Sequence, residues 1–72
     1  MKTNTELLKK FGCKVQAYRK VLGLSQEELA FRAGFHRTYI GMVERAERNI
    51  TLSNIQRLAE ALKIEIKDFF SE

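Results

Sequence analysis

Residues 25–45 read SQEELAFRAGFHRTYIGMVER, and this stretch decides the fold. Ser25 is followed three positions later by Glu28, the spacing of a capping box, so a short helix is predicted from about residue 26 to residue 32. Gly34 then breaks that helix. A second helix is predicted to begin at His36 or Arg37 and to end near Arg45. The stretch therefore predicts two short helices joined by a tight turn that contains glycine.

Three further helices are predicted outside this stretch. The apolar spacing of residues 6–22 and 52–63 is typical of amphipathic helices, and residues 66–71 favour a short last one. Thr51 is expected to cap the helix at 52–63, and that helix is expected to bury Leu52 among other residues. The sequence contains no proline and no strand-like alternation beyond residues 64–66. The predicted class is all-α, with five helices in a single domain at 1–72.

The composition limits the chemistry of the chain. A domain of 72 residues is marginally stable. Such a domain usually needs further stabilisation from disulfides, a metal or a partner subunit. One cysteine excludes an internal disulfide, and one cysteine with one histidine cannot form a four-ligand zinc site. We therefore expect no metal, no cofactor, and stabilisation by self-association. No signal peptide or membrane span is evident, so a cytoplasmic location is expected, away from membranes.

The charge suits a polyanionic partner but is unevenly distributed. The formal net charge is +4. Residues 1–24 hold six basic side chains and one acidic one, whereas residues 25–72 hold seven basic and eight acidic ones. The excess positive charge thus lies on the first predicted helix, so bulk charge alone does not locate a binding site.

Two short helices with a glycine-containing turn form a helix-turn-helix, in which the second helix enters the major groove of double-stranded DNA. On the second helix, at about 37–45, Ile40 and Val43 are predicted to point inward. Arginine can donate two parallel hydrogen bonds to a guanine base, and threonine can contact thymine. The predicted base-reading residues are Arg37, Thr38, Gly41 and Met42. Gly41 is expected to lie exposed on the outward arc of this helix, where a glycine removes bulk and lets the backbone approach the bases closely; the alternative is a glycine that is merely tolerated there.

Other polar residues near this helix are predicted to contact the DNA backbone. Gln26 begins the first helix of the pair, where free amides suit a phosphate. His36, Arg45, Arg48 and Asn49 flank the second helix. The alternatives are a solvated helix start for Gln26, a surface histidine for His36 and solvated loop charges around Arg48.

Arg19 and Glu44 are predicted to form a structural ion pair. Arg19 lies at the edge of the apolar face of the first helix, and Glu44 lies on the inner margin of the reading helix. A charge near the core needs a partner. The pair would fix the reading helix against the first one.

Several motifs together resemble a known family. They are Ser25 to Ala30, Gly34, Tyr39-Ile40, Glu44-Arg45, Leu52 and the Leu58-Ala59-x-x-Leu62 run. This pattern is similar to the Cro/C1-type (XRE) helix-turn-helix family. The stretches 36–40, 44–45 and 48–52 resemble controller proteins of restriction–modification systems more closely still.

The resemblance implies a five-helix, lambda-repressor-like fold, with the helix-turn-helix at about 26–45 and a dimerisation surface at about 50–72. It implies base reading by Arg37 and Thr38, and places Tyr39 among the backbone or local structural contacts. It also implies a homodimer that binds inverted-repeat operators. Members often have glycine at position 46, but this chain has Ala46, so the turn there need not be left-handed. Members also often carry a polar side chain at Gly41 and at Ala46, so fewer base contacts are expected.

An apolar cluster near residue 70 is the predicted dimer surface. Its members are Ile64, Ile66, Phe69 and Phe70. One phenylalanine, most simply Phe69, is expected to pack within the subunit, and Phe70 with Ile66 to cross the twofold axis. The alternative is that all four pack within the monomer.

The sequence leaves two other functions as alternatives. An antitoxin-like or other protein-interaction module could use the same fold, but nearly every residue belongs to the helical domain. An enzyme is the weakest alternative, because the carboxylates are scattered and no base is placed to serve Cys13. The sequence therefore predicts a non-enzymatic regulator.

Overall fold

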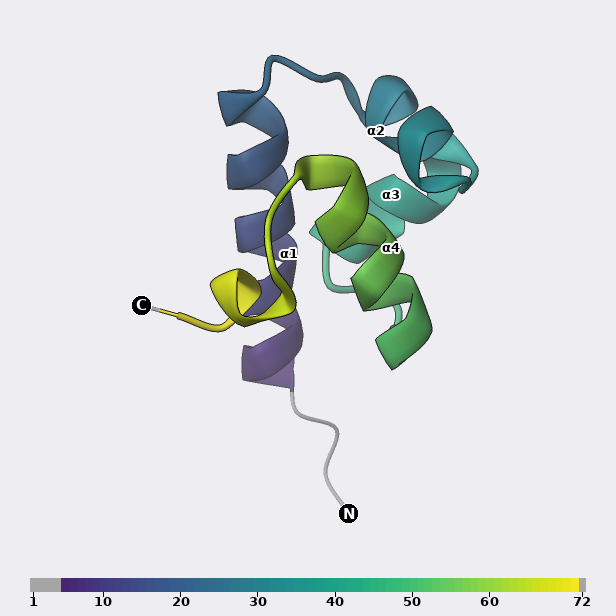
Figure 1. The fold of residues 1–72 in the computed structure, drawn as a ribbon. Helices are drawn as coiled ribbons and strands as arrows, with labels where there is room; N and C mark the ends of the chain where they lie inside the picture. Colours follow the sequence, from purple (N-terminus) through teal and green to yellow (C-terminus); the bar gives the residue numbers. More distant parts are fainter. Residues whose placement is uncertain (1–4, 72) are drawn as a thin grey trace.

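The structure is a computed structural model that describes residues 5–71. It contains α1 (Thr5–Val21), α2 (Gln26–Ala33), α3 (Arg37–Glu44), α4 (Leu52–Leu62) and the 3₁₀ turn η1 (Ile66–Phe69) (Figure 1). The all-α class is confirmed, and the four α-helices lie within two residues of their predicted bounds. The fifth predicted α-helix is wrong, because residues 66–69 form only a 3₁₀ turn.

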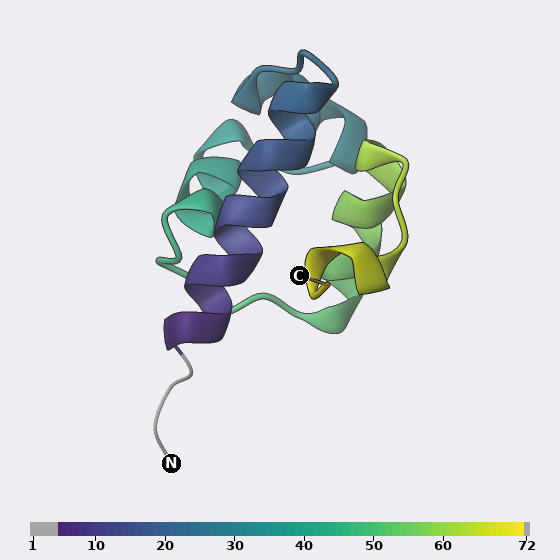
Figure 2. The ribbon, with the colours of Figure 1, turned by 90° about the vertical axis from the view of Figure 1, so that its left-hand side faces the viewer.

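α1 runs along one side of the molecule, with α3 and α4 packed beside it; α2 packs against α3 and α4, and η1 returns to the first half of α1 (Figures 1 and 2). The core lies between these elements. Its fully buried large side chains are Val15, Leu29, Ile40, Leu58, Leu62 and Phe69. Both inward residues predicted for α3, Ile40 and Val43, are buried.

Each predicted cap of α2 and α4 forms. The Ser25 hydroxyl accepts a hydrogen bond from the Glu28 backbone at 3.0 Å, and the Glu28 carboxylate accepts one from the Ser25 backbone at 2.8 Å. These bonds lower the pKa of Glu28. Thr51 accepts from the Asn54 backbone at 3.1 Å. The capping box thus begins the helix-turn-helix at the residue that the sequence indicates.

The turn between α2 and α3 is held by hydrogen bonds from α4. Gly34 ends α2 with φ at +78°, a conformation that favours glycine. Arg57 of α4 donates to the backbone oxygens of Ala33 at 3.1 Å and Gly34 at 2.6 Å, and its guanidinium lies 4.1 Å from the ring centre of Phe35. A cation on carbonyls at a helix end is favourable, so Arg57 fixes the angle between the two helices.

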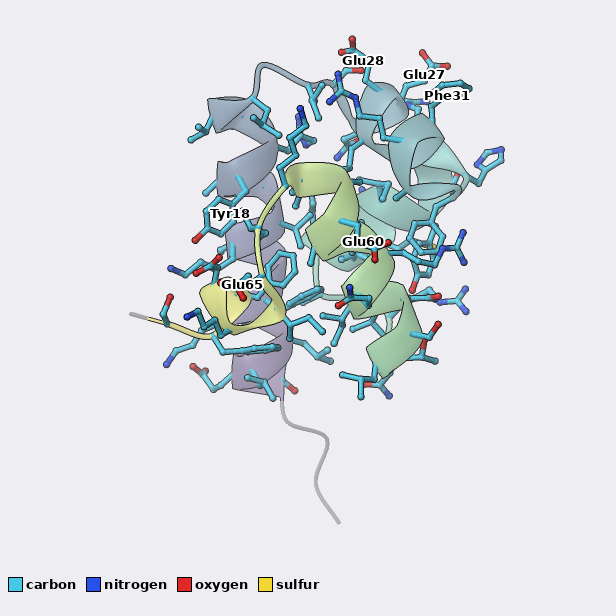
Figure 3. The ribbon with its side chains drawn as sticks, in the orientation of Figure 1. Tyr18, Glu27, Glu28, Phe31, Glu60 and Glu65 are labelled. Carbon is cyan, nitrogen blue, oxygen red and sulfur yellow. The ribbon has the colours of Figure 1, made fainter. Side chains whose placement is uncertain are left out.

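Several apolar side chains are exposed, and two of them, Leu52 and Phe31, bear on the argument. Leu52, predicted to be buried, is 71% exposed, because it is the first residue of α4 and lies beyond the buried stripe. Phe31 is 86% exposed, and Figure 3 shows its side chain pointing away from the body beside Glu27. Among residues 5–71, no helix has the length and apolarity needed to span a bilayer.

The closing turn η1 carries one buried side chain, that of Phe69. Phe69 is almost fully buried, with its ring 4.8 Å from Phe11 and 6.2 Å from Tyr18 of α1. The Tyr18 hydroxyl donates to the Asp68 backbone at 3.3 Å, and Figure 3 shows Tyr18 beside this turn. Four residues suffice to carry one ring into the core, so no α-helix is needed.

Candidate nucleic-acid interface

Several of the predicted DNA-contacting residues line one shallow hollow on the outward side of α3. The lining residues are Gln26, Arg37, Thr38, Gly41 and Arg45. Arg37 and Thr38 begin α3 and are exposed. The predicted reading pair is therefore presented outward on a rigid helix, with a guanidinium from the other end of α3 beside it.

His36 has a defined local role at the start of α3. It is the N-cap residue, and its Nδ1 accepts a hydrogen bond from the Thr38 backbone at 3.1 Å. The side chain is exposed. His36 therefore holds the first turn that carries Arg37 and Thr38, and its contact with a DNA backbone remains a prediction.

Gly41 is buried, contrary to the expectation that it lies exposed on the outward arc. The guanidinium of Arg45 covers it, and a Cβ at position 41 would lie only 3.0 Å from Nη1 of Arg45. The absence of a side chain at Gly41 makes room for a neighbouring side chain rather than for a base directly.

Arg45 is paired with a residue that the sequence reasoning did not single out. Its Nε donates to Oε2 of Glu47 at 2.9 Å, and its Nη2 donates to Oε1 at 3.2 Å. These bonds lower the pKa of Glu47 and raise that of Arg45. A pair two residues apart is not expected on a helix, which explains why the sequence pattern missed it.

The turn after α3 explains this pairing. Ala46 has φ at +61°, so the left-handed geometry forms despite the lack of glycine. The backbone N–H of Ala46 bonds to the oxygen of Val43 at 3.1 Å, and that of Glu47 bonds to the oxygen of Met42 at 2.8 Å. These are the two bonds of a Schellman motif. The chain reverses at Ala46, and Glu47 comes to lie beside Arg45.

Tyr39 and Arg48 form a second group next to α3. The Arg48 guanidinium lies 5.6 Å from the ring centre of Tyr39, and the ring of Phe35 lies 4.8 Å from it. The Tyr39 hydroxyl accepts from Nδ2 of Asn54 at 3.1 Å. Sequence reasoning missed Asn54, because its partner lies fifteen positions away.

Two predicted contact residues lie outside the hollow. Met42 is half-buried and does not line it. Asn49 is exposed and borders a different, mainly apolar hollow, together with Leu7, Leu8, Phe11, Ile50, Ile55 and Phe70. Base reading by Met42 and backbone contact by Asn49 therefore remain predictions without a shared site.

A buried network supports α3 from its inner side. Arg19 donates to Glu44 through Nε at 2.7 Å and Nη2 at 3.0 Å, and through Nη1 to the Leu24 oxygen at 2.8 Å. The Gln26 amide donates to the same carboxylate at 3.1 Å. The predicted ion pair is thus present, and it raises the pKa of Arg19. The side chain of Gln26 is thus bonded within this network, and contact of the start of α2 with a phosphate remains a prediction.

The predicted dimer cluster divides into different environments. Phe69 is 1% exposed and packs against Phe11 and Tyr18, which confirms the expectation that it packs within the subunit and removes it from the predicted dimer surface. Ile64 and Ile66 are half-buried against the core. Phe70 is 47% exposed and stacks on Phe11 at 6.0 Å. The described residues include no group of three or more His, Cys, Asp or Glu side chains suited to a metal ion.

With this geometry in view, comparison with known proteins places the chain in a family. The profile of HTH_3, described as helix-turn-helix, matches residues 15–69. The chain belongs to this family. The match includes α2, α3 and the hollow between them, and it extends through η1.

Individual family members are similar over most of the chain. The control protein C.BamHI of Bacillus amyloliquefaciens is 45% identical over 69 residues, which cover 94% of this chain and 83% of that protein. The control protein C.SmaI of Serratia marcescens is 56% identical over 52 residues, which cover 72% of this chain and 62% of that relative.

A crystal structure in the same group has a similar backbone. The restriction-modification controller protein C.AhdI from Aeromonas hydrophila superposes with a TM-score of 0.85 at 51% identity. The alignment covers 88% of this chain and 96% of that one. The resemblance inferred from sequence motifs is therefore confirmed.

Proposed function

We propose that this chain is a cytoplasmic, homodimeric transcription regulator that binds inverted-repeat operators and controls a restriction–modification system. The single observation that carries the proposal is the outward presentation of Arg37 and Thr38 on α3, in one hollow with Arg45. Relatives named as control proteins support the choice of system. The second helix of this motif enters the major groove, and no enzymatic step is needed.

The proposed reading begins at the first turn of α3. The Arg37 guanidinium would fork onto O6 and N7 of guanine, and Thr38 would offer its methyl group to thymine. The buried Arg19–Glu44 pair ties α3 to α1. Each half-site should therefore contain a G and a T, and in a dimer two half-sites would lie about 34 Å apart.

Selection of binding sites from random duplexes tests this proposal. The wild type should select an inverted repeat, and its affinity should fall steeply as salt rises. Arg37→Ala should cost about 1–3 kcal/mol and relax preference at one position. Arg32→Ala is the matched control, because Arg32 is exposed in the last turn of α2 and does not line the hollow. Equal binding of all sequences by the wild type would contradict the proposal.

The dimer surface is proposed around Phe70, with Ile64 and Ile66 beside it. Phe70 is half-exposed next to the apolar hollow that includes Leu8 and Ile55. Sedimentation at micromolar concentration should give a dimer for the wild type and a monomer for Phe70→Ser. Phe31→Ser is the control, since Phe31 is more exposed and lies on α2, away from η1 (Figures 1 and 3). A stable wild-type monomer would overturn this part.

A protein-interaction module is the second candidate, and exposed Phe31 is the observation in its favour. Single exposed apolar residues are common on soluble proteins, so this support is weak. Purification with a stoichiometric protein partner, together with unselective DNA binding, would favour this second function. Genes for a methyltransferase and an endonuclease beside the coding sequence would favour the controller.

A further inference from the structure

The Arg45–Glu47 pair has a defined bidentate geometry that its contribution to folding does not explain. Two hydrogen bonds, at 2.9 and 3.2 Å, join side chains that are 58% and 49% exposed. An exposed pair of this kind adds little to the free energy of folding. The left-handed Ala46 that brings the two together is itself unfavourable for a residue with a Cβ. The arrangement therefore calls for a role beyond folding.

The position of the guanidinium gives the first indication of that role. Arg45 does not extend past the end of α3 but folds back over Gly41, one turn towards the start of the helix. There it joins Arg37 and Thr38 around the outward hollow. A Cβ at position 41 would meet Nη1 of Arg45 at 3.0 Å, so this placement depends on the glycine.

The hydrogen bonds leave one edge of the guanidinium available. Glu47 takes the Nε hydrogen and one Nη2 hydrogen of Arg45. The far edge, formed by Nη1 and the second Nη2 hydrogen, still presents two parallel N–H donors. That edge matches O6 and N7 of guanine.

The charge of Glu47 separates a base from a phosphate as the target. A phosphate bound by Arg45 would lie within a few ångströms of the Glu47 carboxylate, and two negative charges so close repel each other. The guanine edge carries acceptors without a net charge. The carboxylate thus favours a base over the DNA backbone as the group that Arg45 contacts.

From these observations we infer that Arg45 is a third base-reading side chain, directed at a guanine, with Glu47 as its positioning residue and Gly41 as the space it occupies. The inference rests on the proposed function and changes the role first predicted for Arg45, which was a backbone contact. It also restores a base contact at the position where the lack of a polar side chain at Gly41 indicated a loss.

Binding-site selection with three variants tests the inference. Arg45→Ala, Glu47→Gln and Gly41→Ala should each lose preference for the same G·C pair, by about tenfold or more. Preference at the positions read by Arg37 and Thr38 should remain. Gly41→Ala is the sharpest variant, because alanine in a helix favours folding, so loss of preference there cannot be due to unfolding. Thermal melts of each variant and Arg32→Ala serve as controls.

A second measurement separates positioning from simple charge. On random duplex, Glu47→Gln should bind more tightly than the wild type, because a negative charge is removed, while its preference for the G·C pair falls. The double variant Gly41→Ala with Arg45→Ala should prefer that pair no less than Arg45→Ala alone, since both changes remove one contact.

The outcomes distinguish the inference from the function on which it rests. If the wild type selects an operator and all three variants keep its full base preference, Arg45 contacts only the backbone and the inference is wrong. The same holds if Glu47→Gln strengthens operator and random binding equally. If the wild type selects no sequence, the proposed function itself fails.

Discussion

α3 has an arginine–glutamate pair on each side, and the two pairs have the same chemistry but different burial. Arg19–Glu44 is buried, with side chains 10% and 4% exposed, whereas Arg45–Glu47 is about half exposed. Each side also has a glycine that makes room, Gly12 inside and Gly41 outside. The shortest N···O distances, 2.7 and 2.9 Å, are nearly equal. Distance therefore says little about what a pair does, and burial decides it.

The largest expected effect comes from breaking the inner pair. Arg19→Met would leave the Glu44 carboxylate buried without its partner, so the free energy of unfolding in urea should fall by about 3–5 kcal/mol. Arg45→Met is the matched control and should leave the urea midpoint almost unchanged. A double-mutant cycle on Arg19 and Glu44 with coupling near zero would show that the inner pair is not structural.

The two glycines should respond to alanine in opposite directions. A Cβ at Gly12 would lie 2.7 Å from the backbone oxygens of Val43 and Glu44, which cannot move without shifting α3. Gly12→Ala should therefore destabilise the domain by about 1–3 kcal/mol. Gly41→Ala would meet only the movable end of Arg45, and it should stabilise the domain by up to about 1 kcal/mol. Equal thermal shifts for the two variants would contradict this contrast.

The turn that creates the outer pair should tolerate glycine. Ala46→Gly should raise the free energy of unfolding by about 1 kcal/mol or less, because glycine adopts positive φ without strain. Lys63→Gly, at the same φ of +61° after α4, is the control and should give a similar gain. If thermal melts showed a loss in Ala46→Gly alone, the Ala46 methyl group would have a packing role.

The smallest effect on stability is expected at the outer pair itself. Glu47→Gln should not measurably change the urea midpoint, since the side chain is exposed. The hydrogen bonds from Arg45 lower the pKa of Glu47. The small contribution of the ion pair to stability is therefore fully present above the ordinary glutamate pKa, and it is lost only as the pH falls through the lower folded-state pKa of Glu47. Preference for the G·C pair assigned to Arg45 should therefore stay constant between about pH 5 and pH 8. A loss of preference for that pair within this range, measured by binding-site selection, would argue against the role of Glu47.

The inner side of α3 could be predicted from the sequence because it follows helical periodicity. The spacing of Ile40 and Val43 indicates the buried face, and a charge beside that face requires a partner, which led to Arg19 and Glu44. The capping box at Ser25 indicates the start of α2, because its signal lies within four consecutive residues. Each of these inferences needs only regular geometry.

The outward position of Arg37 and Thr38 could be predicted, but the placement of Arg45 beside them could not, because it depends on a departure from regular geometry. Alanine at position 46 argues against a left-handed turn, yet the chain adopts positive φ there, so neither the reversal nor the meeting of Arg45 with Glu47 could be predicted. The burial of Gly41 follows from that meeting. The burial of Phe69 could be predicted, whereas nothing in the apolar spacing indicates that Phe70 stacks on Phe11 while staying half-exposed.

The contact of η1 with α1 has a consequence for synthesis on the ribosome. Phe69 fills the core against Phe11 and Tyr18, which are translated more than fifty residues earlier. A nascent chain that has reached only the end of α4 therefore lacks the ring that closes its interior. Premature termination a few codons before position 69 should yield a protease-sensitive product, although every helix of the reading motif has already been made.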